Sequence, residues 1–323
     1  MGSKRRVGFI VIAIALAISV YIFLKPPPPS GSRIVILKYT THPALDELEK
    51  SFIERLNSNV KGNPALANIE IEQYNAGGNQ QRAMEYARIA TDPKVKLILA
   101  IGTPAAQAVS KTDSSIPLLY GAVANPKDAG LIPSARATGI QNASPQVIEQ
   151  AVAFIHTMFP KATRIGTLYN PSEQNSVGVQ KFIQASCDAR NLQLIQVTVN
   201  DPSQIFSRAE YLASQVDVIY SANDNTVNSG VASVVQVAKN TRKPFVIGDL
   251  STLAKGPLAA VGLDYGEMGK DLADMAVDIL SGKPVSAVPP RAAPQAQIWI
   301  RESALKELGL SVPSPLADQV TMK

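Results

Sequence analysis

Short apolar runs rich in β-branched residues alternate along this chain with longer stretches of helical periodicity. In the first half, strands are predicted over 33–39, 69–74, 95–101 and 116–122, with helices over 43–56 and 80–90. In the second half, strands are predicted over 164–169, 192–199, 216–222, 243–249, 258–265 and 297–300, and helices over 145–159, 226–240, 266–280 and 302–308. Strands that alternate with helices are typical of parallel βαβ units, so the pattern predicts an α/β protein with doubly wound parallel sheets.

The two halves correspond at the ends of their strands. RIVILKYTTHPALD parallels RIGTLYNPSEQNS, VKLILAIGTPAAQAV parallels VDVIYSANDNTVNSG, and IPLLYGAVANP parallels KPFVIGDLSTL. Each strand ends in a small or polar tip and a turn. Ordinary polarity of βα loops is one interpretation. Open α/β sheets bind ligands beyond the carboxyl ends of their strands, so two facing sheets would instead place these tips around one interlobe cleft.

The first thirty residues have a separate pattern. Lys4, Arg5 and Arg6 precede an uncharged apolar run over 7–24, and Lys25 and four prolines follow it. The run is longer than a signal-peptide core of about 7–15 residues and matches the roughly 17–25 that span a bilayer. We therefore predict a retained transmembrane anchor over 1–25, oriented with the body outside the cytoplasm. A cleaved signal peptide is the alternative. Residues 26–32 form a proline-rich linker, which should be a stiff spacer.

Charge and composition exclude several classes of protein. A length of 323 residues predicts about two domains. The net charge of +5 falls to 27 basic against 26 acidic residues once the four cations of residues 1–25 are removed from the 31. The body therefore lacks the basic surface of a nucleic-acid binder. Cys187 is the only cysteine, and two isolated histidines give no metal-ligand spacing. No metal or cofactor is expected.

Six motifs in order carry a resemblance to a known family: YTTHPALDELEKSF, AIGTPAAQAV, TGIQNASP, LYNPSEQNS, NDNTV and LAAVGLDYGEMG. Over about 33–310 the chain resembles ABC-transporter substrate-binding proteins of the tryptophan/tyrosine type. The resemblance implies a type I periplasmic-binding-protein fold, no catalysis, ABC permease partners and an amino-acid-like ligand, which is aromatic in the best-understood members. It also implies lobe 1 at 33–141 plus 265–283 and lobe 2 at 142–264 plus 284–323, in a body that we expect to be monomeric. The chain departs from the family in lacking a lipid-attachment cysteine and at Leu250-Ser251-Thr252, where a more acidic turn is commoner.

A zwitterionic ligand needs donors for its carboxylate and an acceptor for its ammonium. Thr103 precedes Pro104 and Ala105 at a predicted helix start, where free backbone N–H groups would bind a carboxylate. Helix capping alone is the alternative. Further candidates at strand tips are Asn125, Asn170, Asn175 and Ser176, for which capping and ligand contact are both open.

Asp224 is the principal candidate for binding the ammonium. It ends an apolar strand in the second half of the chain, at the position that corresponds to Thr103 in the first half. A carboxylate–ammonium bond is charge-assisted and stronger than a neutral hydrogen bond, although Asp is also a common helix N-cap. Asn225 follows it, and Asp249 is the second acidic candidate. Tyr39 and His42 are placed to cover a ligand side chain, with a core-edge role as the alternative for Tyr39.

Two rival functions are open. An enzyme with Asp224 and Asp249 as paired carboxylates would need a nucleophile, metal or phosphate loop, and the sequence has no such motif. A membrane-anchored sensor that presents the same cleft to a receptor remains the alternative to transport.

Overall fold

The computed structural model describes residues 31–323 apart from 61–65, 67, 133, 223 and 293–295. The predicted anchor over 1–25 and the four prolines after it lie outside the described residues. Within the part of the chain that is described, no helix is both long and apolar enough to span a bilayer.

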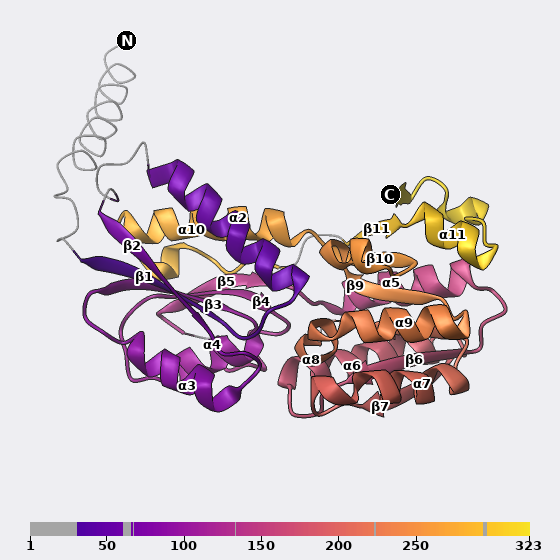
Figure 1. The fold of residues 1–323 in the computed structure, drawn as a ribbon. Helices are drawn as coiled ribbons and strands as arrows, with labels where there is room; N and C mark the ends of the chain where they lie inside the picture. Colours follow the sequence, from indigo (N-terminus) through magenta and orange to yellow (C-terminus); the bar gives the residue numbers. More distant parts are fainter. Residues whose placement is uncertain (1–30, 61–65, 67, 133, 223, 293–295) are drawn as a thin grey trace, which may run out of the picture.

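Two β-sheets lie side by side, each covered by helices (Figure 1). The first is entirely parallel and has the order β2-β1-β3-β4-β5. Its strands are β1 (Ser32–Lys38), β2 (Ile69–Asn75), β3 (Val95–Ile101), β4 (Leu118–Val123) and β5 (Ala137–Gln141).

The second sheet repeats this order as β7-β6-β8-β9-β10 and adds β11 and β12 beyond β10. Strand β11 is antiparallel to β10, so the sheet is parallel over its first five strands only. The strands are β6 (Arg164–Tyr169), β7 (Gln193–Thr198), β8 (Val218–Ser221), β9 (Phe245–Asp249), β10 (Ala259–Leu263), β11 (Gln297–Ile300) and β12 (Val320–Met322).

Helices cover both faces of each sheet, because successive strand residues point to opposite faces and are apolar on both. In β1, Ile34 and Ile36 pack in one core, whereas Val35 and Leu37 pack in another. The helices are α2 (Pro43–Val60), α3 (Gln80–Ile89), α4 (Thr103–Ser110), α5 (Pro145–Met158), α6 (Gln174–Asp188), α7 (Ile205–Gln215), α8 (Asn225–Ser229), α9 (Val231–Thr241), α10 (Tyr265–Leu280) and α11 (Glu302–Leu308). Short 3-10 turns are η2 (Pro202–Gln204), η3 (Leu250–Lys255), η4 (Val285–Ala287) and η5 (Ser314–Leu316).

The chain passes between the sheets three times. It leaves the first sheet after β5, returns before α10, which packs along α2, and leaves again before β11. Residues 284–291 differ from the sequence assignment to lobe 2. Thr138 Oγ1 donates to the carbonyl of Val288 at 2.6 Å, and the backbone N–H of Arg291 donates to Gly139 O at 2.9 Å. This segment therefore lies on β5 of the first sheet.

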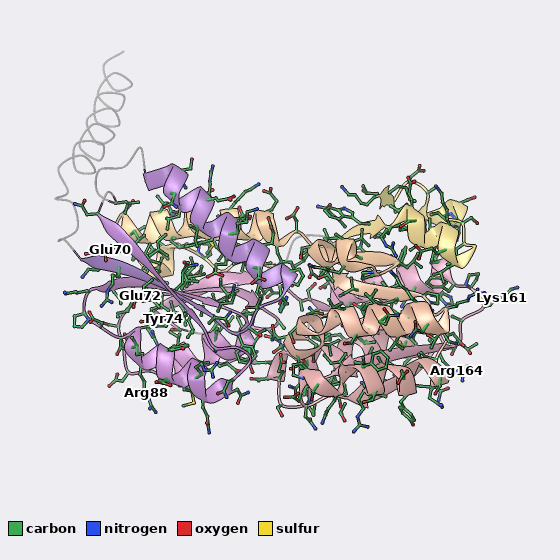
Figure 2. The ribbon with its side chains drawn as sticks, viewed as in Figure 1. Glu70, Glu72, Tyr74, Arg88, Lys161 and Arg164 are labelled. Carbon is green, nitrogen blue, oxygen red and sulfur yellow. The ribbon has the colours of Figure 1, made fainter. Side chains whose placement is uncertain are left out.

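The outer ends of the molecule carry charged side chains. Figure 2 shows Glu70, Glu72 and Tyr74 along β2, and Lys161 and Arg164 at the far end of the second sheet. Glu72 accepts hydrogen bonds from Arg33, at 2.6 Å, and from the hydroxyl of Tyr74. Charged side chains on an edge strand such as β2 oppose pairing with another chain.

Candidate ligand-binding site

The shared strand order locates the candidate site. In each sheet the strand order reverses next to the strand that comes first in the sequence. The reversal lies between β1 and β3 in the first sheet and between β6 and β8 in the second. Ligands of open α/β sheets bind beyond the carboxyl ends of the strands at this switch point. Tyr39 and Thr103 follow β1 and β3, and Asn170 and Asp224 follow β6 and β8. Four of the predicted residues therefore come from the two switch points.

On the first-sheet side, the turn before α4 brings Thr103 to the junction. Gly102 has a φ of 95°, and a Cβ there would lie 3.3 Å from Cβ of Tyr39, so this tight turn requires glycine. Thr103 is buried, and its hydroxyl oxygen accepts from the N–H of Ala124 at 3.2 Å. The first N–H groups of α4, apart from Pro104, which has none, lack intrahelical acceptors, and Thr103 lines a cavity between the sheets. Ala105 instead packs in the core beneath α4 and contributes no side chain to the site.

Tyr39 faces the acidic side of the junction. Its hydroxyl donates to the carbonyl of Gly78 at 2.7 Å, and its side chain is buried. Burial raises the pKa of Tyr39, and the nearby carboxylates of Glu173 and Asp224 raise it further. The ring from one sheet therefore lies beside two acids from the other.

Glu173 is the central residue on the second-sheet side, and the sequence analysis missed it. It is 1% exposed and precedes α6. Its Oε2 accepts from the side-chain Nδ2 of Asn225 at 2.5 Å, and its Oε1 accepts from the backbone N–H of Thr226 at 3.0 Å. The hydroxyl of Thr226 also donates to Oε1 at 2.7 Å. The signal for Glu173 was its place in YNPSEQNS, as an acid just before a helix at a strand tip.

Asp224 is both a helix cap and a buried charge. Its Oδ1 accepts from the N–H of Val227 at 2.8 Å, which caps α8, and its Oδ2 accepts from the N–H of Asn170 at 2.6 Å. Ser176 also hydrogen-bonds this carboxylate. Burial raises the pKa of Asp224 to about 7, and repulsion from Glu173 adds to the effect, although the three hydrogen bonds oppose it.

The third candidate acid, Asp249, is committed to its own turn. Its carboxylate accepts from the N–H of Ser251 at 3.0 Å and from the hydroxyls of Ser251 and Thr252. Asp249 is 1% exposed. Across the described residues, none of the ion pairs includes Asp249, Glu173 or Asp224. Within the described part of the chain, three buried carboxylates at the junction therefore have no lysine or arginine partner, although buried charges are usually paired.

Two small cavities lie between the sheets on either side of Asn175. The inner one, of about 10 Å³, is polar and is lined by His42, Leu45, Ala122, Asn142, Asn175, Asn225, Asn228 and Tyr265. The outer one, of about 20 Å³, lies at the start of α4 and is partly apolar, with lining residues Thr103, Ala124, Asn125, Asp128, Ala129, Gln174, Asn175, Gly178, Val179 and Phe182. Each has room for about one water-sized group in this conformation.

Hydrogen bonds close the rim of the junction. Gln174 of α6 accepts from the side-chain amide of Gln107 and donates to the carbonyl of Asp128. Gln80 donates to the carbonyl of Ser172 at 3.3 Å. These bonds connect α3, α4 and the loop after β4 to the other sheet, so the two halves are closed on one another along this side.

The structure thus gathers most of the sequence-predicted residues at one junction. Asn175 and Asn225 line the inner cavity, and Thr103, Asn125 and Asn175 line the outer one. Asn170 and Ser176 hydrogen-bond Asp224, and the carboxylates of Asp224 and Glu173 both act on Tyr39. Cys187 lies elsewhere, in the apolar core, and burial raises the pKa of its thiol to about 11.

A hinged pair of α/β lobes with a polar junction defines a periplasmic-binding-protein fold, and comparison with known proteins identifies the family. The family model for ABC transporter substrate binding proteins matches residues 33–321. A tyrosine-binding protein of Clostridioides difficile is 30% identical over 280 residues, which are 86% of this chain and 81% of that protein. The chain therefore belongs to the ABC transporter substrate-binding family, and the resemblance drawn from the six motifs is confirmed.

Solved structures agree in fold. An ABC domain from Streptococcus pneumoniae in complex with L-tryptophan has a TM-score of 0.82 at 25% identity, and 90% of this chain covers 99% of that one. The ligand-free, open structure of a substrate-binding protein with adhesive properties from Clostridium difficile has a TM-score of 0.66 at 27% identity, with the same coverage. These relatives are solute-binding proteins and not enzymes, which agrees with the non-enzymatic function that the sequence predicted.

Proposed function

We propose that the junction binds a free amino acid, with an aromatic one as the first candidate, and that the chain delivers it to an ABC permease. The observation that carries this proposal is the set of buried carboxylates without a cationic partner among the described residues, at the junction that Thr103 also reaches. An ammonium would supply the missing positive charge. The donors at Thr103 and α4 would bind the carboxylate of the same molecule.

The relatives support an aromatic ligand. One is a tyrosine-binding protein, and another was solved with L-tryptophan. A bulky side chain would extend from the polar inner cavity toward Val179 and Phe182 of the outer one. Binding from both lobes would favour the closed arrangement, because a ligand shifts a conformational equilibrium only by its differential affinity for the two states.

The test is calorimetry on the purified protein with L-tryptophan, L-tyrosine and the other common amino acids. Asp224→Asn retains acceptor and donor groups at the cap but removes the charge. Hydrogen bonds to charged groups contribute about 1.5–3 kcal/mol, so we expect this variant to bind the best ligand roughly ten- to a hundredfold more weakly. Unchanged affinity would show that Asp224 is a helix cap only.

We also propose that the two lobes comprise residues 33–141 with 265–291 and 142–264 with 296–323, in a monomer held at the membrane by residues 1–25. The anchor rests on the uncharged apolar run over 7–24. Carbonate extraction should leave the full-length protein in the membrane pellet, and light scattering should give a monomer once detergent is subtracted. A soluble, shortened protein that begins near Pro26 would instead show a cleaved signal peptide.

A further inference from the structure

A relay of hydrogen bonds runs from Glu173 to His42 across the two lobes. Both carboxylate oxygens of Glu173 accept backbone N–H groups, from Asn225 at 3.3 Å and from Thr226 at 3.0 Å. Oε2 also lies 2.5 Å from Nδ2 of Asn225. Only the NH₂ end of an amide can donate to a carboxylate. Glu173 therefore fixes which way the Asn225 amide points and directs its Oδ1 away, toward the first lobe.

The fixed amide determines the tautomer of His42. Oδ1 of Asn225 lies 3.3 Å from Nε2 of His42, and an amide oxygen only accepts hydrogen bonds. Nε2 must therefore carry a hydrogen. Burial lowers the pKa of His42, against the opposing effects of Asp249, Asn225, Asp46 and Glu173. In the neutral ring with Nε2 protonated, Nδ1 is an acceptor.

The inner cavity consequently presents acceptors that need a donor. His42 and Asn228 both line it and are 5% and 3% exposed. Nδ1 of His42 and Oδ1 of Asn228 have no hydrogen-bond partner among the described residues. Asp249 and Glu173 both act electrostatically on His42. A small group with several N–H donors and a positive charge satisfies all of these features, and an ammonium is such a group.

We propose that Glu173, acting through Asn225, holds His42 in the Nε2–H tautomer so that Nδ1 accepts a hydrogen bond from the ammonium of the ligand. His42 is then a ligand contact, and Glu173 is a positioning residue. This inference rests on the proposed amino-acid function for the identity of the donor. The tautomer itself does not depend on any ligand.

The first test measures the tautomer directly. His42 and His156 are the only histidines, and His156 is exposed on α5. Side-chain ¹⁵N NMR of the full chain should therefore show two imidazoles. A His156→Gln variant would assign the signals. At pH 7.5 we expect His42 to be neutral with its hydrogen on Nε2. In Glu173→Gln, whose amide can donate to Asn225, the His42 signals should move toward the other tautomer while those of His156 stay. A His42 ring with its hydrogen on Nδ1 in the unaltered protein would overturn the relay.

The second test separates the two ring nitrogens with a matched pair of variants. In His42→Asn the amide lies near the position of Nδ1, whereas in His42→Gln it reaches the position of Nε2. We expect His42→Gln to bind L-tyrosine or L-tryptophan at least tenfold more weakly, and His42→Asn to lose clearly less. Circular dichroism and thermal melting should first show that both variants are folded.

An analogue without the amino group completes the cycle. In the unaltered protein 3-(4-hydroxyphenyl)propionate should bind more weakly than L-tyrosine, and the difference should shrink in His42→Gln, since interacting groups are not additive. The contact would be ruled out if the difference in affinity between the two compounds stayed the same in His42→Gln, or if His42→Asn bound the ligand more weakly than His42→Gln. If neither amino acid binds the unaltered protein, the proposed function fails for these ligands, and the proposed contact of His42 with the ammonium fails as well. The NMR measurement would still show whether Glu173 sets the tautomer of His42.

Discussion

Asp224 shows that the two roles considered for one residue need not exclude each other. It caps α8 through the N–H of Val227, and its second oxygen accepts from Asn170. Neither bond neutralises the charge, because both donors are neutral backbone groups. Water would stabilise the charge of an exposed cap, but Asp224 is only 3% exposed. Its burial is what turns an ordinary cap into a group whose protonation responds to a bound cation.

Ligand affinity should accordingly depend on pH. The pKa of Asp224 is raised to about 7, first by burial and then by Glu173, so the folded protein takes up a proton there as the pH falls below about 7. An ammonium favours the ionised carboxylate and would release that proton on binding. We expect affinity for an amino acid to fall from pH 7.5 to pH 5.5, by at most about tenfold per unit. Protonation of His42, whose pKa is lowered, would act in the same direction at more acid pH.

Calorimetry in buffers with different ionisation enthalpies would measure both the affinity and the proton release. Asp224→Asn is the control, since it should remove most of the dependence between pH 7.5 and 6. Affinity that rises as the pH falls would contradict the cation site, because protonation of a nearby carboxylate removes negative charge and cannot favour an ammonium.

The site residues that the sequence predicted share one property, which is their position at the end of an apolar strand. Thr103, Asn170 and Asp224 have it, and the structure places them at the two switch points. Glu173 lies three residues beyond its strand tip, and in the sequence it resembles an ordinary acid before a helix. What distinguishes it is contact with Asn225 and Thr226, some fifty residues later. Such long-range pairing has no local signature, so the pattern of an acid before a helix at a strand tip did not distinguish Glu173 from an ordinary cap.

At the scale of elements, strands buried on both faces were predictable and marginal ones were not. The strands β3 and β6 match the predicted ranges, because short continuous apolar runs bounded by turns are typical of strands in a sheet covered on both faces. Strand β5, five residues with the sequence ATGIQ, and the three-residue β12 were not among the predicted strands. Short strands are held by their neighbours in the sheet and not by their own pattern, so tertiary context decides them.

Helix boundaries show the same division. The helix predicted over 226–240 is two helices, α8 and α9, which meet at Gly230. The backbone there, with φ −109° and ψ 23°, departs from helical geometry. A Cβ at this position would lie 2.3 Å from Cδ1 of Ile205, so the break brings the backbone against η2 and α7. The periodicity of apolar residues continues across Gly230 and therefore conceals the break.

At the scale of the molecule, hydrogen bonds between the two lobes close the rim of the junction. The TM-score is 0.82 with the L-tryptophan complex and 0.66 with the ligand-free, open structure, although identity and coverage are nearly equal. The chain therefore matches the structure solved with L-tryptophan more closely in its overall arrangement than the ligand-free, open one. The two small cavities and the bonds at the rim agree with this arrangement.

Gln174 should control how readily the lobes separate. Its side chain bonds both Gln107 and Asp128, so one residue of α6 connects the second lobe to two segments of the first. Hydrogen bonds contribute about 0.5–1.5 kcal/mol each, and exposed ones lie at the lower end, so Gln174→Ala should destabilise the closed state by about 1–2 kcal/mol. Because that cost falls on the closed state alone, ligand affinity should drop by roughly five- to thirtyfold, with most of the change in the dissociation rate.

Gln184→Ala is the matched control, since Gln184 lies on the same helix and bonds only Asp188 among the described residues. Small-angle scattering should show a larger radius of gyration for Gln174→Ala and none of this change for Gln184→Ala. Equal affinities and dimensions for the two variants would mean that the rim bonds follow closure without stabilising it.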